Sequence, residues 1–133
     1  MPSYDHTVPG RRRILIVEDD ADLRRMFRHA LTFAGFDVQE VGDGLAALRA
    51  IEADRPHGIV LDLGLPLVSG HTVLQDVAAQ AHTRQIPVVV VTGQPGDHDG
   101  LEVACVLRKP VSPDELVIVV RRCLASGAPG MRS

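Results

Sequence analysis

Polar side chains that could do chemistry stand at the ends of four apolar runs of this chain. Acids at Glu18 to Asp20 follow the first run, and Asp62, Thr92 and Lys109 follow the other three. Carboxylates that share one site raise each other's pKa unless a cation lies among them, and Mg²⁺ prefers such oxygen ligands. With a hydroxyl and a lysine they are the components of phosphoryl transfer. Asp62, which precedes the flexible Gly64, is our candidate nucleophile.

Lys109 strengthens the expectation of phosphate chemistry, because it is the only lysine among fourteen basic residues. Lysine presents a compact, mobile charge that suits a phosphoryl group, whereas the fork of arginine imposes a fixed geometry. Considered singly, these residues have ordinary explanations: acids after a strand often interact with the N-terminus of the next helix, and Asp62, Thr92 or Lys109 alone could belong to a turn or a strand end. The prediction of a reactive site therefore depends on the combination.

The hydrophobic pattern indicates the elements that must position these side chains. Short apolar runs rich in β-branched residues are typical of strands buried on both faces, and segments with helical spacing separate them. The expected strands are 14–17, 36–41, 57–61, 88–91 and 103–107, and the expected helices are 20–34, 45–55, 71–81 and 112–124. This alternation predicts a doubly wound α/β fold with a parallel sheet. Ligands bind at the carboxyl ends of such strands, where the polar residues lie.

The composition fits one small domain. The chain has 133 residues, 45% of them hydrophobic, with three Phe, one Tyr and no Trp, so aliphatic side chains must form the core. A formal net charge of −3 gives no reason to expect a nucleic-acid partner. Cys105 and Cys123 lie in apolar stretches and are expected to be reduced. No segment has the pattern of a signal peptide or a membrane span, so we expect a soluble, cytoplasmic protein with no membrane partner.

Four stretches resemble the receiver domains of two-component response regulators, the CheY-like superfamily. They are ILIVEDD at 14–20, LDLGLPLVSG at 61–70, VTG at 91–93 and RKP at 108–110, in the family's order and with most of its separations. The resemblance covers residues 12–125 and implies a five-stranded, flavodoxin-like sheet in the order 2-1-3-4-5. Residues 1–11 and 126–133 are then terminal tails.

The resemblance also implies the acceptor and the metal ligands. Asp62 would be the phosphoacceptor and would form an acyl phosphate. Mg²⁺, with Mn²⁺ as a substitute, would bind to Asp19 directly, to Glu18 largely through water, and to Asp62 and the main-chain carbonyl of Gly64. Asp20 matches a position that is usually not a ligand.

The remaining site residues would act on the phosphoryl group. By resemblance, Thr92 would donate its hydroxyl, the small Gly93 would leave room, and Lys109 would pair with the same group. The Lys109–Pro110 bond is expected to be cis, a form that only X-Pro bonds adopt readily. Such domains are phosphoacceptors rather than enzymes, although they catalyse their own phosphorylation from phosphohistidine and a slow hydrolysis of the acyl phosphate.

The sequence departs from the family at the output end. Val106 stands where the family usually has a Tyr or Phe that rotates as a switch. The segment between Thr92 and Lys109 is shorter than usual by about five residues, or roughly one and a half helical turns. Its Gly and Pro residues disfavour a helix, so we expect the fourth helix to be missing or shortened. An alternative docking surface is the first helix with its arginines, Arg24, Arg25 and Arg28, which could equally be a solvated face.

The chain ends soon after the helix at 112–124, so we expect a single-domain response regulator. A histidine kinase or phosphotransfer protein would phosphorylate it, and it would signal by protein–protein contact as a monomer or a phosphorylation-dependent dimer. The alternatives are an excised receiver of a hybrid histidine kinase and a pseudo-receiver that binds partners without phosphorylation. The sequence identifies neither the kinase nor the downstream protein.

Two other classes fit less well. A phosphatase of the haloacid-dehalogenase type needs a second Asp two residues after its nucleophile, where this chain has Gly64. A flavodoxin-like flavin binder needs a Ser/Thr/Gly loop after the first strand, and the acids from Glu18 to Asp20 would repel a phosphate there.

Overall fold

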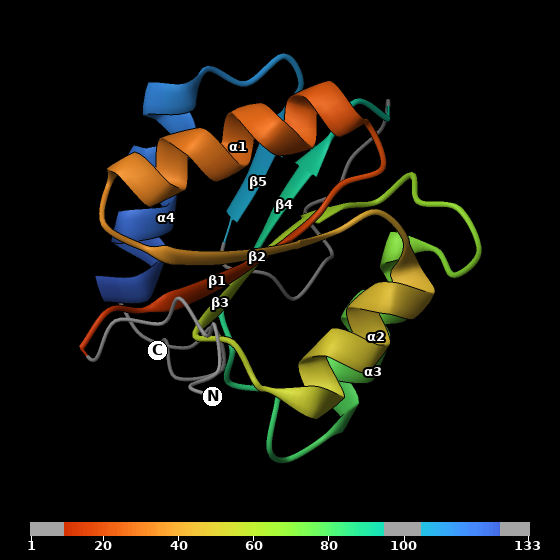
Figure 1. The fold of residues 1–133 in the computed structure, drawn as a ribbon. Helices are drawn as coiled ribbons and strands as arrows, with labels where there is room; N and C mark the ends of the chain where they lie inside the picture. The colour runs from red at the N-terminus through yellow and green to blue at the C-terminus, as the bar shows by residue number, and fades with distance from the viewer. Residues whose placement is uncertain (1–9, 95–104, 126–133) are drawn as a thin grey trace, which may run out of the picture.

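The computed structural model describes residues 10–94 and 105–125 (Figure 1). Its strands are β1 (Arg13–Val17), β2 (Asp37–Val41), β3 (Gly58–Asp62), β4 (Val88–Thr92) and β5 (Cys105–Arg108). Its helices are α1 (Ala21–Phe33), α2 (Gly44–Ala53), α3 (Gly70–Ala79) and α4 (Pro113–Ala125). All nine elements were predicted from the sequence, with bounds that differ by at most two residues.

The five strands form one parallel sheet in the order β2-β1-β3-β4-β5, which confirms the predicted order. The chain moves outward from β1 to β2 and then returns to the other side of β1 for β3, so the crevice at the carboxyl ends of β1 and β3 is a switch point. The register pairs Val17 with Leu61, Asp62 with Val91, and Thr92 with Arg108. The residues that end these strands therefore lie along one edge of the sheet.

Helices cover both faces of the sheet, with α1 and α4 on one side and α2 and α3 on the other (Figure 1). Side chains of a strand alternate between the two faces. Ile14 and Ile16 of β1 accordingly pack with the core under α1 and α4, whereas Leu15 and Val17 pack with the core under α2 and α3. Every residue of β3 and β4 is buried, which explains why these strands have continuous apolar sequences.

Each of the four helices begins with a side chain that accepts a hydrogen bond from a backbone N–H of the first turn. The acceptors are Asp20, Asp43, Ser69 and Ser112, at 2.9, 2.7, 3.1 and 3.1 Å. Such caps satisfy N–H groups that have no partner within the helix. They fix the point where each chain segment leaves the sheet edge and enters a helix, and thereby hold the loops that carry the polar residues.

Two details differ from the sequence prediction or lie beyond it. The buried face of α2 is made by Ala47, Ala50 and Ile51, whereas Leu45, the larger apolar residue at the start of the predicted helix 45–55, is 37% exposed. The small alanine side chains let α2 lie close to the sheet. A prediction from large apolar residues does not identify such a face. The predicted loss or shortening of the fourth family helix concerns residues that are mostly within 95–104, outside the described residues.

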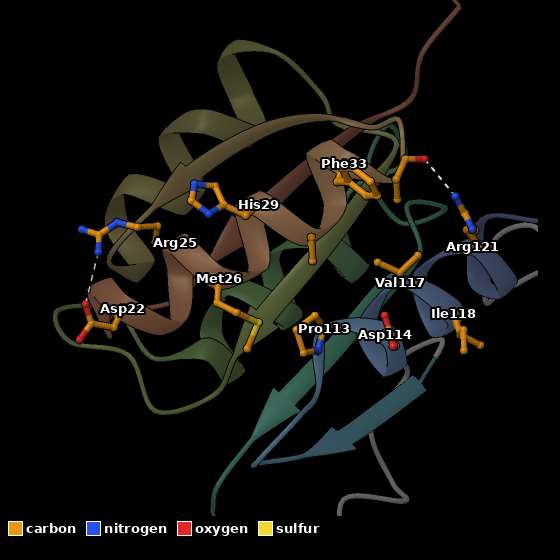
Figure 2. Close-up of a pocket in the computed structure, with 12 residues that line it drawn as sticks. Asp22, Arg25, Met26, His29, Phe33, Pro113, Asp114, Val117, Ile118 and Arg121 are labelled. Carbon is orange, nitrogen blue, oxygen red and sulfur yellow. Dashed lines mark hydrogen bonds and ion pairs between the residues drawn. The ribbon is translucent and has the colours of Figure 1, made fainter.

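An open groove of about 970 Å³ runs between α1 and α4 (Figure 2). Met26 and Ala30 line it from α1 and Val117 from α4, and Phe33 and Ile118 at the groove are 96% and 54% exposed. These two side chains therefore contribute little to the core. Among residues 10–94 and 105–125, no helix is long and apolar enough to cross a membrane.

Candidate functional site

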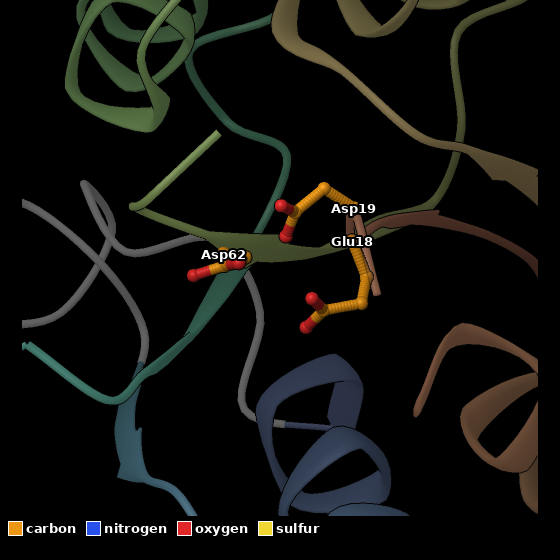
Figure 3. Close-up of side chains that lie close together, drawn as sticks. All are labelled: Glu18, Asp19 and Asp62. Carbon is orange, nitrogen blue, oxygen red and sulfur yellow. The ribbon is translucent and has the colours of Figure 1, made fainter. Parts of the chain in front are cut away.

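Three carboxylates meet at the carboxyl ends of β1 and β3. Glu18 and Asp19 directly follow β1, and Asp62 is the last residue of β3. One oxygen from each lies within 4.8 Å of the others, and Figure 3 shows the three side chains gathered at this edge. Glu18 and Asp62 are buried, with 1% and 5% of their surface exposed, while Asp19 is open to solvent. Such a set of oxygen atoms, with one open side, suits a hard divalent cation.

The carboxyl group of Glu18 is affected by its burial. Burial raises the pKa of its carboxyl group to about 7, although Lys109 and the Asp20 amide favour the charged form. Glu18 Oε2 accepts a hydrogen bond from Asp20 N at 3.2 Å. Glu18 Oε1 is buried and forms an ion pair with Lys109 Nζ at 3.0 Å, and it has no other partner among the described residues. The ion pair offsets part of the cost of burying this oxygen, and its remaining lone pair can bind a further cation or an ordered water.

Lys109 follows β5 and brings one positive charge to the three carboxylates. Its Nζ lies 3.0 Å from Glu18 Oε1 and 3.4 Å from Asp62 Oδ2. Partial burial alone would lower the pKa of Lys109, but the ion pairs with Glu18 and Asp62 outweigh it and raise the pKa. The Lys109–Pro110 bond is cis, as expected. The lysine is therefore protonated and directed inward at neutral pH.

Thr92 ends β4 beside Lys109, and its side chain is fully buried. The hydroxyl oxygen accepts a hydrogen bond from Gln94 N at 3.0 Å, and Thr92 O accepts one from Lys109 N at 2.9 Å. Because the oxygen already accepts a bond, its proton can be directed at a further group. A Cβ at Gly93 would lie 3.7 Å from the Lys109 side chain, an ordinary contact. A Cβ would therefore fit beside the lysine, and the room that Gly93 leaves for the phosphoryl group stays a prediction.

Gly64 and Pro110 complete the predicted residues at the rim. Gly64 N donates a hydrogen bond to Asp62 Oδ1 at 3.1 Å and so orients the carboxylate. Both Gly64 and Pro110 are exposed. Metal coordination by the Gly64 carbonyl remains a prediction.

Val106 lies within β5, three residues before Lys109. It pairs with Val90 in the sheet and is half-buried against the core under α2 and α3. The position therefore holds a compact aliphatic side chain that has no aromatic ring to rotate.

Two glycines contribute to the site in a way that the sequence analysis did not predict. A Cβ at Gly44 would lie 1.8 Å from Val68 O, and a Cβ at Gly70 would lie 2.4 Å from Asp62 O. The loop after Asp62 is thus held between the first turns of α2 and α3. Gly70 belongs to a stretch that resembles the receiver family, and this was the only signal available from the sequence.

Comparison with known proteins shows the family to which this chain belongs. The family model for the response regulator receiver domain matches residues 14–121. This chain is a response regulator receiver. Among curated relatives, the receiver is 39% identical to the DNA-binding response regulator MtrA of Mycobacterium tuberculosis over 116 residues, which are 84% of this chain and 50% of the relative. It is 35% identical over 117 residues to the transcriptional regulatory protein PrrA of Mycobacterium bovis, covering 84% of this chain and 49% of PrrA.

Solved structures agree with this assignment. A putative response regulator from Chloroflexus aurantiacus is 30% identical and superposes with a TM-score of 0.79, over 86% of this chain and 98% of that one. The receiver domain of a sensor histidine kinase from Pseudomonas aeruginosa, 27% identical, has a TM-score of 0.80 over 87% and 99% of the two chains, and holds a magnesium ion in its active-site cleft. The receiver described here spans about half the length of the curated relatives it matches.

Proposed function

We propose that this receiver accepts a phosphoryl group on Asp62 from a histidine kinase or a histidine phosphotransfer protein, in a reaction that depends on Mg²⁺. The observation that carries the proposal is the convergence of three carboxylates and one lysine, with Lys109 Nζ 3.0 Å from Glu18 and 3.4 Å from Asp62. This is a set of groups that can hold a divalent cation and a phosphoryl group together.

In the proposed reaction an oxygen of Asp62 attacks the phosphorus of a phosphohistidine. The new bond is the P–O bond of an acyl phosphate, and the P–N bond to the imidazole breaks, leaving its electron pair on the imidazole. Gly64 N holds one carboxylate oxygen in place. Lys109 and the Thr92 hydroxyl bind the transferred oxygens, since both groups are donors at this edge. The later hydrolysis of the acyl phosphate returns Asp62 to its free form.

The residues present fit a magnesium site. Glu18, Asp19 and Asp62 supply oxygen atoms within 4.8 Å of one another, and one lysine does not balance three carboxylates. Glu18 Oε1 is in addition a buried oxygen whose one partner among the described residues is Lys109. Asp19, Asp62 and the Gly64 carbonyl would hold the ion directly and Glu18 largely through water. When bound, Mg²⁺ or Mn²⁺ would supply the positive charge that offsets the carboxylates and the phosphoryl oxygens.

The consequences of phosphorylation belong to the same proposal. The receiver acts as a phosphoacceptor in a cytoplasmic two-component system and not as an enzyme with a separate substrate. It transmits the signal through protein–protein contacts made by its own surface, as a monomer or a phosphorylation-dependent dimer. The curated relatives named above are DNA-binding or transcriptional regulators about twice as long, whereas the prediction of no nucleic-acid partner depends on the net charge of −3 of this 133-residue chain.

Intact-mass measurement tests the proposal. The wild type, Asp62→Ala and the control Asp114→Asn, which changes an exposed acid of α4, are incubated with acetyl phosphate and Mg²⁺ or with EDTA. We expect one phosphate adduct on the wild type and on Asp114→Asn with Mg²⁺, and none on Asp62→Ala or with EDTA. An adduct on Asp62→Ala would show that another residue is the phosphoacceptor. No adduct on any protein, repeated with a phosphohistidine protein as donor, would favour a pseudo-receiver.

A further inference from the structure

Arg24 connects the candidate site to the neighbouring strand and helix. It lies in the first turn of α1, its side chain is 23% exposed, and its Nη1 donates a hydrogen bond of 2.8 Å to the main-chain oxygen of Glu18. Glu18 directly follows the last residue of β1, where the chain turns toward α1. The guanidinium group therefore holds the backbone that carries two of the three carboxylates.

The same guanidinium group is itself fixed. Arg24 Nε pairs with Glu40 Oε1 of β2 at 3.2 Å, and Glu40 Oε2 pairs with Arg28 Nε at 2.5 Å. A Cβ at Gly42 would lie 3.2 Å from Arg24 Nη1, so a glycine leaves the space that the guanidinium group occupies. The planar fork of arginine can donate to two acceptors at once, which an ammonium group on a flexible stem does less well. Arg24 and Arg28 are thus engaged within the domain, and the alternative of a docking surface on α1 stays a prediction.

We infer that Arg24 is a positioning residue for the metal and phosphoryl site, acting through the main chain of Glu18. The inference rests on the proposed function of the site. Arg24 does not reach the carboxylates; it holds the main-chain segment from which Glu18 and Asp19 extend toward Asp62. Groups that orient ligands in this way typically contribute ten- to a hundredfold to metal affinity.

The direction in which cation affinity changes when Arg24 is replaced separates a positioning role from a simple effect of its charge. A guanidinium group near three carboxylates repels a divalent cation through space, so its removal strengthens cation binding if charge is its only influence. Loss of positioning weakens cation binding instead. Arg28 is the matched control, because it also carries one positive charge on α1 and pairs with Glu40, yet none of its hydrogen bonds or ion pairs described above reaches Glu18.

The first experiment is a titration of metal-free protein with Mn²⁺, followed by electron paramagnetic resonance of the free ion. We expect Arg24→Ala to bind Mn²⁺ about tenfold more weakly than the wild type, Arg24→Lys to recover part of this loss, and Arg28→Ala to bind as tightly as the wild type or more tightly. Equal or tighter binding by Arg24→Ala would overturn the inference.

A second readout needs no metal. Glu18 N donates to Val41 O and Asp20 N to Glu18 Oε2, both at 3.2 Å, whereas Ile59 N bonds to Pro87 O away from the site. In Arg24→Ala, hydrogen exchange at the amides of Glu18 and Asp20 should accelerate about tenfold, the size expected when a charge-assisted hydrogen bond is lost. Exchange at Ile59 should not change, and Arg28→Ala should resemble the wild type. Uniform acceleration at all three amides would reduce Arg24 to a general stabilising role. If the wild type binds no Mn²⁺, the proposed function fails, while this exchange pattern still decides whether Arg24 holds the Glu18 main chain.

Discussion

A Cβ atom at Gly70 would lie 2.4 Å from the carbonyl oxygen of Asp62 and 2.5 Å from the Cα of Leu63. Gly70 N also donates a hydrogen bond of 3.1 Å to Leu63 O. The first turn of α3 is thus in direct contact with the end of β3, and only a residue without a side chain allows this approach. The main chain of Asp62 is held from below by α3, while Lys109 and the Gly64 amide hold its carboxylate.

Replacing Gly70 tests this contact. We expect Gly70→Ala to lower the free energy of unfolding by about 1–3 kcal/mol, because backbone atoms on both sides must move apart. Urea unfolding at a fixed pH measures the change. Gly64→Ala is the control, since a Cβ there would meet only ordinary contacts, the nearest at 3.6 Å. Equal midpoints of urea unfolding for the two variants would mean that α3 moves to accommodate the added Cβ atom without loss of stability.

Replacing Lys109 should change metal binding and phosphorylation in opposite directions. Without its charge, the carboxylates of Glu18 and Asp62 are offset only by the divalent cation, so Lys109→Met should bind Mn²⁺ severalfold more tightly than the wild type. Phosphorylation by acetyl phosphate should slow by about a hundredfold, because a donor to the phosphoryl group is lost. Lys109→Arg keeps the charge and should retain ordinary Mn²⁺ affinity. An unchanged rate of phosphorylation of Lys109→Met would show that the reaction does not need the lysine.

Asp20 should differ in role from the two acids before it. Its side chain accepts a hydrogen bond from Leu23 N at 2.9 Å and caps α1. Asp20→Ala should therefore destabilise the fold by about 1 kcal/mol, and Asp20→Ser should retain most of the stability. Both variants should bind Mn²⁺ as the wild type does, which calorimetric titration can check. A large loss of Mn²⁺ affinity in Asp20→Ser would instead place Asp20 among the ligands.

His57 gives the domain a pH dependence away from the site. Its Nδ1 accepts a hydrogen bond from Arg13 N at 2.9 Å. Burial lowers the pKa of His57 below its ordinary value of 6.5. The positive charges of Arg12, Arg13 and Arg55 lower this pKa further, against the opposing effect of Asp54.

Below pH 6.5 the unfolded chain therefore binds a proton at His57 before the folded chain does, and stability falls as the pH falls through this window. We expect the stability difference between the wild type and His57→Asn to shift against the wild type as the pH is lowered from 7.5 to 5.5. Urea unfolding across this range, with an NMR titration of the imidazole, measures both quantities. A constant difference would show that His57 titrates alike in both states.

The elements and the residues at the strand ends were predictable because both follow from short-range patterns. The buried valines of β4 form a continuous apolar run, and the polar residue after each strand falls at the sheet edge that parallel pairing brings together. The strand order came from the family resemblance, because nothing in the periodicity distinguishes β2 from β3 as the neighbour of β1.

The supporting contacts were not predictable in this way. Gly44 and Gly70 look like ordinary loop glycines until the approach of Val68 and Asp62 is known. Arg24 lies in a helix with other arginines, and only the fold shows that it reaches the main chain of Glu18. These contacts join segments far apart in sequence or depend on the direction of one side chain, and hydrophobic periodicity carries information on neither.

The single lysine of the chain lies within 3.4 Å of two of the three carboxylates, those of Glu18 and Asp62, and a quarter of its side chain is accessible. Amine-directed chemistry therefore has one side-chain target in this protein, apart from the chain's own α-amino group. Reductive methylation with ¹³C-formaldehyde keeps the positive charge and would place two labelled methyl groups on Lys109 Nζ. Their NMR signals would then report, from a single position, whether the cluster is empty, holds a metal or carries an acyl phosphate.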